Sequence, residues 1–269
     1  MSRVLAIANQ KGGVGKTTTS VNLAASLAAF KRPTLLIDLD PQGNATMGSG
    51  IDKRQLFRSS YDVLMGDSSI EDALVTNATA GYHLLPGNAD LTGAEVGLLE
   101  ELGRELRLRH ALEQLRERYD YIIIDCPPSL NMLTVNGLVA AEAVMIPMQC
   151  EYYALEGLTD LVTTLRKVRG NLNPVLQIEG LLRTMFDPRM TLMQQVSGEL
   201  ESHFGDKVYK SIIPRNVRLA EAPSYGKPVI AFDRASKGAQ AYLVLAQEML
   251  DRRDGKIVMS AASEQGALA

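Results

Sequence analysis

The fold is decided by residues 9–18, which read Asn9-Gln10-Lys11-Gly12-Gly13-Val14-Gly15-Lys16-Thr17-Thr18. This glycine-rich segment follows a short apolar run at residues 4–8 and leads into a segment of helical period that starts at Thr17. Glycines let backbone N–H groups turn toward phosphate oxygens without a Cβ clash, and the positive end of the next helix points at the same anion. The pattern predicts a nucleoside triphosphate site, with Lys16 on the β- and γ-phosphates and the Thr17 hydroxyl on Mg²⁺.

Apolar runs alternate with longer segments of helical period along the rest of the chain. We expect strands at residues 4–8, 34–37, 83–85, 121–124, 143–146, 178–185 and 208–213, and helices at 17–30, 94–118, 154–169, 192–203 and 235–252. Continuous apolar runs indicate strands buried on both faces, and intervening helices indicate parallel βαβ units. The sequence therefore predicts an α/β fold, with a doubly wound, mostly parallel sheet and helices on both faces. We expect a single P-loop NTPase domain over residues 1–253 and a flexible C-terminal tail over 254–269.

The composition excludes several classes of protein. The chain has 269 residues, of which 46% are hydrophobic and 22% are charged, as in an ordinary globular protein. Two cysteines and three histidines are too few for a disulfide scaffold or a cluster of metal ligands. No apolar run approaches the length of a membrane span, and the N-terminus lacks the pattern of a signal peptide, so we expect a cytoplasmic protein. The net charge of -3 excludes a globally basic nucleic-acid binder but allows a local basic face.

Acidic side chains follow two of the expected strands. Asp38 and Asp40 come after the run at 34–37, and Asp125 comes after the run at 121–124. Open α/β sheets bind ligands at the carboxyl ends of their strands, where a carboxylate can hold hydrated Mg²⁺ or orient an attacking water. The alternative is that each aspartate caps a loop, as is common in turns between strands and helices.

Lys11 makes the resemblance to a known family specific. The run from Lys11 to Thr18 resembles the deviant Walker A box of the ParA/MinD superfamily of P-loop ATPases, with Gln10 where the usual motif has its first glycine. The resemblance implies a homodimer on ATP binding, in which Lys11 reaches the phosphates of the partner subunit and Gly13 lies at the dimer seam. It also implies ATP contacts from the residues Lys11, Gly12, Gly13, Val14, Gly15, Lys16, Thr17 and Thr18.

The same resemblance assigns roles to the acidic residues. The segment that contains Asp40 matches the switch I region of the family, in which this aspartate positions the attacking water. Asp125 lies in the matching Walker B segment and would bind the magnesium ion through water, beside Thr17. Asp38 would belong to the same outer shell. The catalytic residues implied are thus Lys11, Lys16 and Asp40.

Matches outside the loop narrow the resemblance to the chromosomal, Soj-type ParA ATPases. They lie at residues 149–157, 184–189 and 213–223, so that the resemblance covers about residues 3–250. In that family Pro214 and Asn216 would line the adenine pocket. Glu151 would contact the ribose or the opposing subunit.

The basic side chains are concentrated in one part of the chain. Residues 166–218 contain nine basic and five acidic side chains, which is compatible with a face that binds DNA phosphates without reading bases. The alternative is a set of ordinary solvated helix faces. The resemblance favours Arg189, Arg215 and Arg218 as the residues that bind double-stranded DNA nonspecifically.

The function that these residues and the resemblance imply is ATP-dependent partitioning of a chromosome or plasmid. The ATP-bound dimer would coat the nucleoid, and a ParB-like centromere-binding partner would stimulate a weak intrinsic hydrolysis of ATP to ADP and phosphate. We expect no membrane partner.

Three other functions stay open from the sequence. A membrane-positioning ATPase of the MinD type would need an amphipathic C-terminal helix, and residues 256–262 are only weakly amphipathic. A ligase or reductase subunit would need a second substrate pocket or a redox cluster. A scaffold would bind the nucleotide without hydrolysing it.

Overall fold

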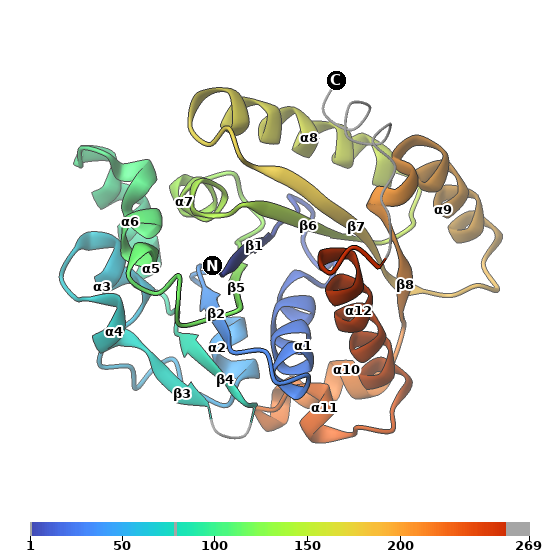
Figure 1. The fold of residues 1–269 in the computed structure, drawn as a ribbon, viewed down its shortest axis with the longest axis horizontal. Helices are drawn as coiled ribbons and strands as arrows, with labels where there is room; N and C mark the ends of the chain where they lie inside the picture. Colours follow the sequence, from blue (N-terminus) through green and yellow to red (C-terminus); the bar gives the residue numbers. More distant parts are fainter. Residues whose placement is uncertain (1, 78–79, 257–269) are drawn as a thin grey trace.

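The computed structural model describes residues 2–77 and 80–256, which form a central sheet flanked by helices (Figure 1). The strands are β1 Arg3–Ile7, β2 Thr34–Asp38, β3 Val75–Asn77, β4 Tyr82–Leu85, β5 Tyr121–Asp125, β6 Ala143–Met148, β7 Gln177–Phe186 and β8 Val208–Pro214. Their order in the sheet is β3-β4-β2-β5-β1-β6-β7-β8. All neighbours pair in parallel except β3 and β4, which are antiparallel.

The helices cover both faces of the sheet. They are α1 Lys16–Ala29, α2 Asn44–Gly48, α3 Ser60–Met65, α4 Ile70–Ala73, α5 Leu91–Gly97, α6 Arg107–Glu113, α7 Met132–Ala140, α8 Ala154–Asn171, α9 Thr191–Phe204, α10 Val217–Glu221, α11 Val229–Phe232 and α12 Lys237–Arg253. Short 3₁₀ turns are η1 Leu98–Glu100, η2 Arg104–Leu106, η3 Gly205–Lys207 and η4 Ala222–Tyr225. Helices α1 and α12 lie side by side on one face, and α7, α8 and α9 lie on the other (Figure 1).

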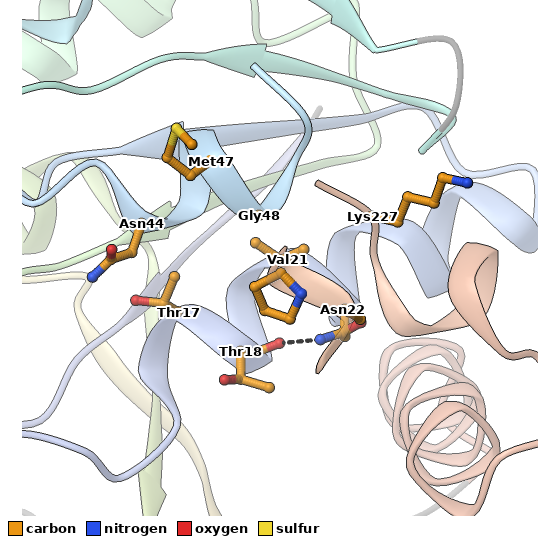
Figure 2. A pocket seen from close by; sticks show the side chains of 10 residues that line it. Thr17, Thr18, Val21, Asn22, Asn44, Met47, Gly48 and Lys227 are labelled. Atoms are coloured by element: carbon orange, nitrogen blue, oxygen red, sulfur yellow. Dashed lines mark hydrogen bonds between the residues drawn. The ribbon is translucent and has the colours of Figure 1, made fainter. Parts of the chain in front are cut away.

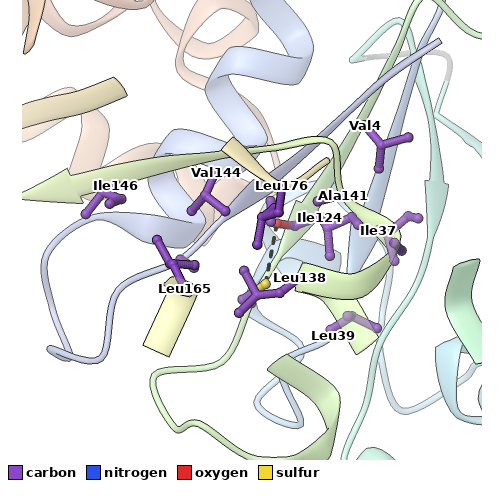
Figure 3. Close-up of a cluster of buried hydrophobic side chains, with 14 of the residues drawn as sticks. Val4, Ile37, Leu39, Ile124, Leu138, Ala141, Val144, Ile146, Leu165 and Leu176 are labelled. Carbon is purple, nitrogen blue, oxygen red and sulfur yellow. Dashed lines mark hydrogen bonds between the residues drawn. The ribbon is translucent and has the colours of Figure 1, made fainter. Parts of the chain in front are cut away.

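Two buried clusters of apolar side chains hold the layers together. In β1, Val4 and Ala6 contribute to the cluster under α7 and α8, whereas Leu5 and Ile7 contribute to the cluster under α1 and α12. Figure 3 shows part of the first cluster, where Val144 and other strand residues face the α7 and α8 side. Strands buried on both faces explain the continuous apolar runs, and the predicted doubly wound α/β fold is confirmed.

Several predicted boundaries and elements were wrong. The single helix expected at 94–118 is instead α5, η1, η2 and α6, because the chain turns at Gly103, which has φ of +65°. The predictions missed α7, a nine-residue helix buried on nearly every side, so its sequence carries almost no helical period. They also missed the antiparallel edge strand β3 and placed the end of β6 at 146, whereas the strand continues to Met148.

The division into a domain at 1–253 and a tail at 254–269 stays a prediction. Helix α12 ends at Arg253, and residues 257–269 lie outside the described residues. In the described ranges, no helix is long and apolar enough to cross a membrane.

Candidate nucleotide-binding site

The glycine-rich loop joins β1 to α1 beside the centre of the sheet. Gly13 and Gly15 have φ of +73° and +87°, a conformation that other residues rarely adopt. No side chain caps the N-terminus of α1, so the first N–H groups of the helix are not satisfied by a capping residue. No described atom lies within 4 Å of a Cβ added at Gly12 or Gly13, which leaves open space over the loop. The loop therefore offers N–H donors and room for an anion.

Side chains from the ends of β6 and β7 hold the loop from outside. Thr184 donates from its hydroxyl to the Val14 carbonyl at 2.8 Å, and Gln149 donates from Nε2 to the Gly13 carbonyl at 2.9 Å. Because these carbonyls are bound from the β6–β7 side, the loop conformation does not depend on the nucleotide alone. The sequence analysis gave neither residue a role. The signal available was their position, since both lie at the carboxyl ends of parallel strands.

Lys16 is the buried cation of the site. It is 7% exposed, and its ammonium donates to the Lys11 carbonyl at 3.1 Å. Burial lowers its pKa, and the nearby charges of Asp125 and Asp40 act in the opposite direction. The ammonium thus lies between the phosphate loop and two acidic residues, as a phosphate-binding lysine requires.

Two fully buried aspartates lie opposite each other at the ends of β2 and β5. Asp38 pairs with Asp125 in the parallel register. Burial raises the pKa of Asp125, and the charge of Asp38 raises it further. Asp38 accepts hydrogen bonds from the backbone N–H and the hydroxyl of Thr46, at 2.8 and 2.7 Å, and burial also raises its pKa.

The donor set fits a magnesium ion. Asp125 Oδ1 accepts a hydrogen bond from Ser20 at 2.8 Å, whereas its buried Oδ2 has no hydrogen-bond partner among the described residues. No group of three or more His, Cys, Asp or Glu side chains in the described ranges could hold a metal ion by itself. Mg²⁺ commonly takes one or two protein oxygens and completes its shell with phosphates and water, which matches Thr17 and Asp125.

Three cavities border the phosphate loop. The first, of about 370 Å³, is lined by Asp40 and by the loop residues Gly12, Gly13, Gly15, Lys16, Thr17 and Thr18. The second, of about 200 Å³, is lined by Pro214 and Asn216 and shares Gly15, Thr18 and Met185 with the first. A third cavity, of about 280 Å³, shares Thr17, Thr18 and Asn44 with the first and is also lined by Val21 and Met47 (Figure 2).

The structure brings together most of the residues singled out from the sequence. Asp40 is 8% exposed, and its Oδ1 accepts a hydrogen bond from the Gln42 N–H at 2.9 Å. Asn216 lines the second cavity and caps α10 by accepting from the Leu219 N–H at 3.3 Å. These placements are compatible with phosphates in the first cavity and a base in the second.

Lys11 lies on the rim of the loop and is paired within its own chain. Its ammonium contacts Glu151 Oε2 at 2.5 Å, and both side chains are about half exposed, at 48% and 45%. The sequence analysis expected Glu151 at the ribose or the opposing subunit. In this structure Glu151 pairs with Lys11 of the same chain, and its contact with the ribose or the opposing subunit stays a prediction.

Of the three candidate DNA-binding arginines, Arg189 and Arg215 lie in loops and Arg218 lies in α10. Arg189 is 87% exposed and makes a bidentate pair with Asp187, at 2.6 and 2.9 Å. Arg218 pairs with Glu221 at 2.8 Å and with Asp233 at 3.3 Å. Arg215 is exposed and lines the second cavity. None of the three is buried, so each is accessible to another molecule.

The strand, loop and helix, with a buried lysine and two aspartates at neighbouring strand ends, define a nucleotide-binding protein of the P-loop class. The model of the AAA domain family matches residues 2–178. The chromosome partitioning protein ParA of Caulobacter vibrioides is 54% identical, over 93% of this chain and 94% of its own. The sporulation initiation inhibitor protein Soj of Bacillus subtilis is 53% identical, over 93% of this chain and 98% of its own. The chain belongs to the ParA/Soj family of chromosome-partitioning ATPases.

One solved structure that is similar to this chain belongs to a protein named as a synthase rather than as a partitioning protein. The crystal structure of a cobyrinic acid a,c-diamide synthase from Mycobacterium smegmatis contains bound ADP and magnesium. It has a TM-score of 0.84 and 41% identity, and the match covers 96% of this chain and 98% of that one. The membership in the ParA/Soj family confirms the predicted ATPase class and the predicted fold.

Proposed function

We propose that this chain is an ATP- and Mg²⁺-dependent partitioning ATPase whose ATP-bound dimer binds double-stranded DNA nonspecifically. A ParB-like partner stimulates hydrolysis and thereby releases the dimer from DNA. The observation that carries the proposal is the position of Lys11, a second lysine on the rim of a complete phosphate site. Lys11 lies outside the loop's own anion site, because its ammonium contacts Glu151.

The nucleotide occupies the first two cavities in this proposal. Lys16 binds the β- and γ-phosphates, the backbone of residues 12–18 cradles the phosphate chain, and Pro214 and Asn216 contact the base. Thr17 and, through water, Asp125 hold Mg²⁺, which neutralises charge on the phosphates. The fit of two adjoining cavities that share Gly15 and Thr18 supports this arrangement.

Hydrolysis depends on Asp40 and on the second subunit. Asp40 lines the phosphate cavity, where its carboxylate can orient a water molecule toward the γ-phosphate. Lys11 exchanges Glu151 for the phosphates of the partner's ATP and stabilises the charge that develops there. The open space at Gly13 allows the two loops to approach closely. Turnover is slow in the isolated protein because the ParB-like partner must complete this arrangement.

DNA binding uses the exposed arginines Arg189, Arg215 and Arg218. Phosphate oxygens replace the carboxylates that neutralise Arg189 and Arg218 in this structure. Contacts to phosphates alone carry no sequence information, so the protein coats the nucleoid in the cytoplasm without a preferred site. Whether the cargo is a chromosome or a plasmid does not alter this mechanism.

The second candidate function is an ATP-driven amide synthesis, which the name of the Mycobacterium smegmatis neighbour suggests. An acid that is activated by ATP must lie beside the γ-phosphate. The third cavity shares Thr17, Thr18 and Asn44 with the first, and its volume is about 280 Å³. The partitioning function is the better supported of the two, because the relatives named for ParA and Soj are 54% and 53% identical to this chain, against 41% for the synthase.

The test is binding to a nonspecific DNA duplex with ATP, with ADP and without nucleotide, across a salt series. Arg189→Ala and Arg218→Ala are measured alongside, and Arg54→Ala, which removes an exposed arginine from another loop, is the control. We expect binding with ATP only, a steep salt dependence, and a flatter dependence in the two variants but not in the control. No binding in any nucleotide state would refute the proposal.

A further inference from the structure

Helix α2 lies directly after the loop that carries Asp40, and hydrogen bonds fix its first turn to Asp38 at the end of β2. Asp38 accepts from the backbone N–H and the hydroxyl of Thr46 in α2. The same hydroxyl accepts a hydrogen bond from the Gly87 N–H at 2.8 Å. Asp38 also accepts from the Asp40 N–H at 3.2 Å. Buried hydrogen bonds therefore join the start of α2 to Asp38 and, through Asp38, to the backbone of Asp40.

The other end of α2 meets a distant part of the chain, backbone against backbone. A Cβ added at Gly50 would lie 2.6 Å from the Gly226 carbonyl oxygen, and a Cβ added at Gly226 would lie 2.7 Å from the Gly50 Cα. Both glycines have positive φ, +81° and +60°. No other residue type permits this approach, because any side chain would separate the two loops.

Gly226 ends the segment that carries Arg218. Helix α10 and turn η4 follow each other without interruption from Val217 to Tyr225, and the N–H of Gly226 bonds back to Pro223 at 3.0 Å. Several bonds within this segment, including that from Ser224 to the Glu221 carbonyl at 2.7 Å, make it compact. The contact at Gly50 thus links α2 to Arg218.

The third cavity gives α2 room to move. Its lining includes Thr18 and Val21 of α1 and Asn44 and Met47 of α2 (Figure 2). Pro223 of η4 also lines it. Close-packed elements resist displacement, whereas an unfilled volume of about 280 Å³ between them allows a shift without steric overlap. Helix α2 is therefore held at both ends and borders this open volume at Asn44 and Met47, while Ala45 packs in the same buried cluster as Val21 of α1.

We propose that α2 is a rigid link that transmits the nucleotide state from Asp40 to the segment of residues 217–226. In this proposal α2 acts on that segment through the Gly50–Gly226 contact. The proposal rests on the proposed function, since it explains how ATP would gate DNA binding. A side chain added at the Gly50–Gly226 contact would uncouple the nucleotide site from the segment that carries Arg218, while leaving each of them intact.

The experiment compares Gly50→Ala with the parent protein. The matched control is Gly103→Ala, because Gly103 also has positive φ, +65°, but no described atom lies within 4 Å of an added Cβ. We measure basal ATP turnover without DNA, and the ratio of DNA affinities with ATP and with ADP. We expect Gly50→Ala to keep basal turnover and to lose at least about fivefold of that ratio, the lower end of typical allosteric coupling. An unchanged ratio in a folded Gly50→Ala protein would overturn the proposal.

Hydrogen exchange on the unmodified protein gives a second test that does not depend on the variant folding. ATP in place of ADP, without DNA, should change exchange in residues 44–50 and 217–226 together. A change in 44–50 alone would refute the link. If the parent showed no ATP-dependent DNA binding at all, the proposed function would fail, and the exchange result would still decide the link.

Discussion

Thr46 offers a sharp test of how the acidic loop is held. Its side chain is fully buried and its hydroxyl makes two hydrogen bonds, donating to Asp38 at 2.7 Å and accepting from the Gly87 N–H at 2.8 Å. Thr46→Val keeps the shape of the side chain and removes both bonds. Thr46→Ser keeps the hydroxyl and removes a methyl group. The two variants therefore separate hydrogen bonding from packing.

The expected cost follows from these contacts. A hydrogen bond to a carboxyl group contributes about 1–3 kcal/mol, and a buried N–H without an acceptor costs about 1–3 kcal/mol. Asp38 keeps its bonds from the backbone N–H groups of Thr46 and Asp40. We expect Thr46→Val to lower the free energy of unfolding by about 2–4 kcal/mol, and Thr46→Ser by about 1 kcal/mol for the lost methyl group.

Urea unfolding measures both values, and thermal unfolding should show a decrease in Tm of roughly 5–15 °C for Thr46→Val. The order of the two variants is the decisive result. If apolar packing controlled this position, valine would be the milder change. A loss of stability for Thr46→Val that is equal to or smaller than the loss for Thr46→Ser would refute the reasoning.

Three other predictions follow from single contacts. Glu151→Gln removes the exposed pair with Lys11, so the unfolding free energy should change by less than ~1 kcal/mol, while light scattering should show a change in ATP-dependent dimerisation. Gly180→Ala places a Cβ 2.6 Å from the ring of Tyr209 and should destabilise by at least about 1–3 kcal/mol, whereas Gly198→Ala, a helix position with open space, should be neutral or stabilising in the same urea assay. The two cysteines are buried and burial raises the pKa of each, to about 11 for Cys150, so a thiol reagent should label them only after unfolding.

The sequence predicted secondary structure best where a strand is buried on both faces. The runs at 4–8, 121–124 and 143–146 predicted three central strands because a strand covered on both faces must be continuously apolar. The sequence was least informative at the β3 edge of the sheet and in α7. Strand β3 has three residues, and α7 is buried on nearly every side, so neither carries the periodicity on which such predictions depend.

The same difference applies to the site. The phosphate loop and the aspartates at the strand ends follow from local patterns, and the structure brings them together. Gln149 and Thr184 could not be assigned, because their contacts with the loop join residues that are more than 130 positions apart and depend on the order of β1, β6 and β7. The pairing of Lys11 with Glu151 is equally non-local.

The exposed cations of the proposed function have one property in common that bears on how the switch responds to salt. Lys11, Arg189 and Arg218 are each paired with a carboxylate of the same chain, and exposed pairs of this kind contribute only about 0–1 kcal/mol. Exchanging a carboxylate for a phosphate is therefore inexpensive. When such an arginine binds DNA, the duplex releases a counterion, but the freed carboxylate attracts one. Each paired arginine must then contribute less than the ~0.9 per phosphate expected of a free cation to the slope of log affinity against log salt. Such weak internal pairing does not by itself keep the protein off DNA, so in the proposed function the gating has to come from dimerisation, which brings many of these contacts together at once.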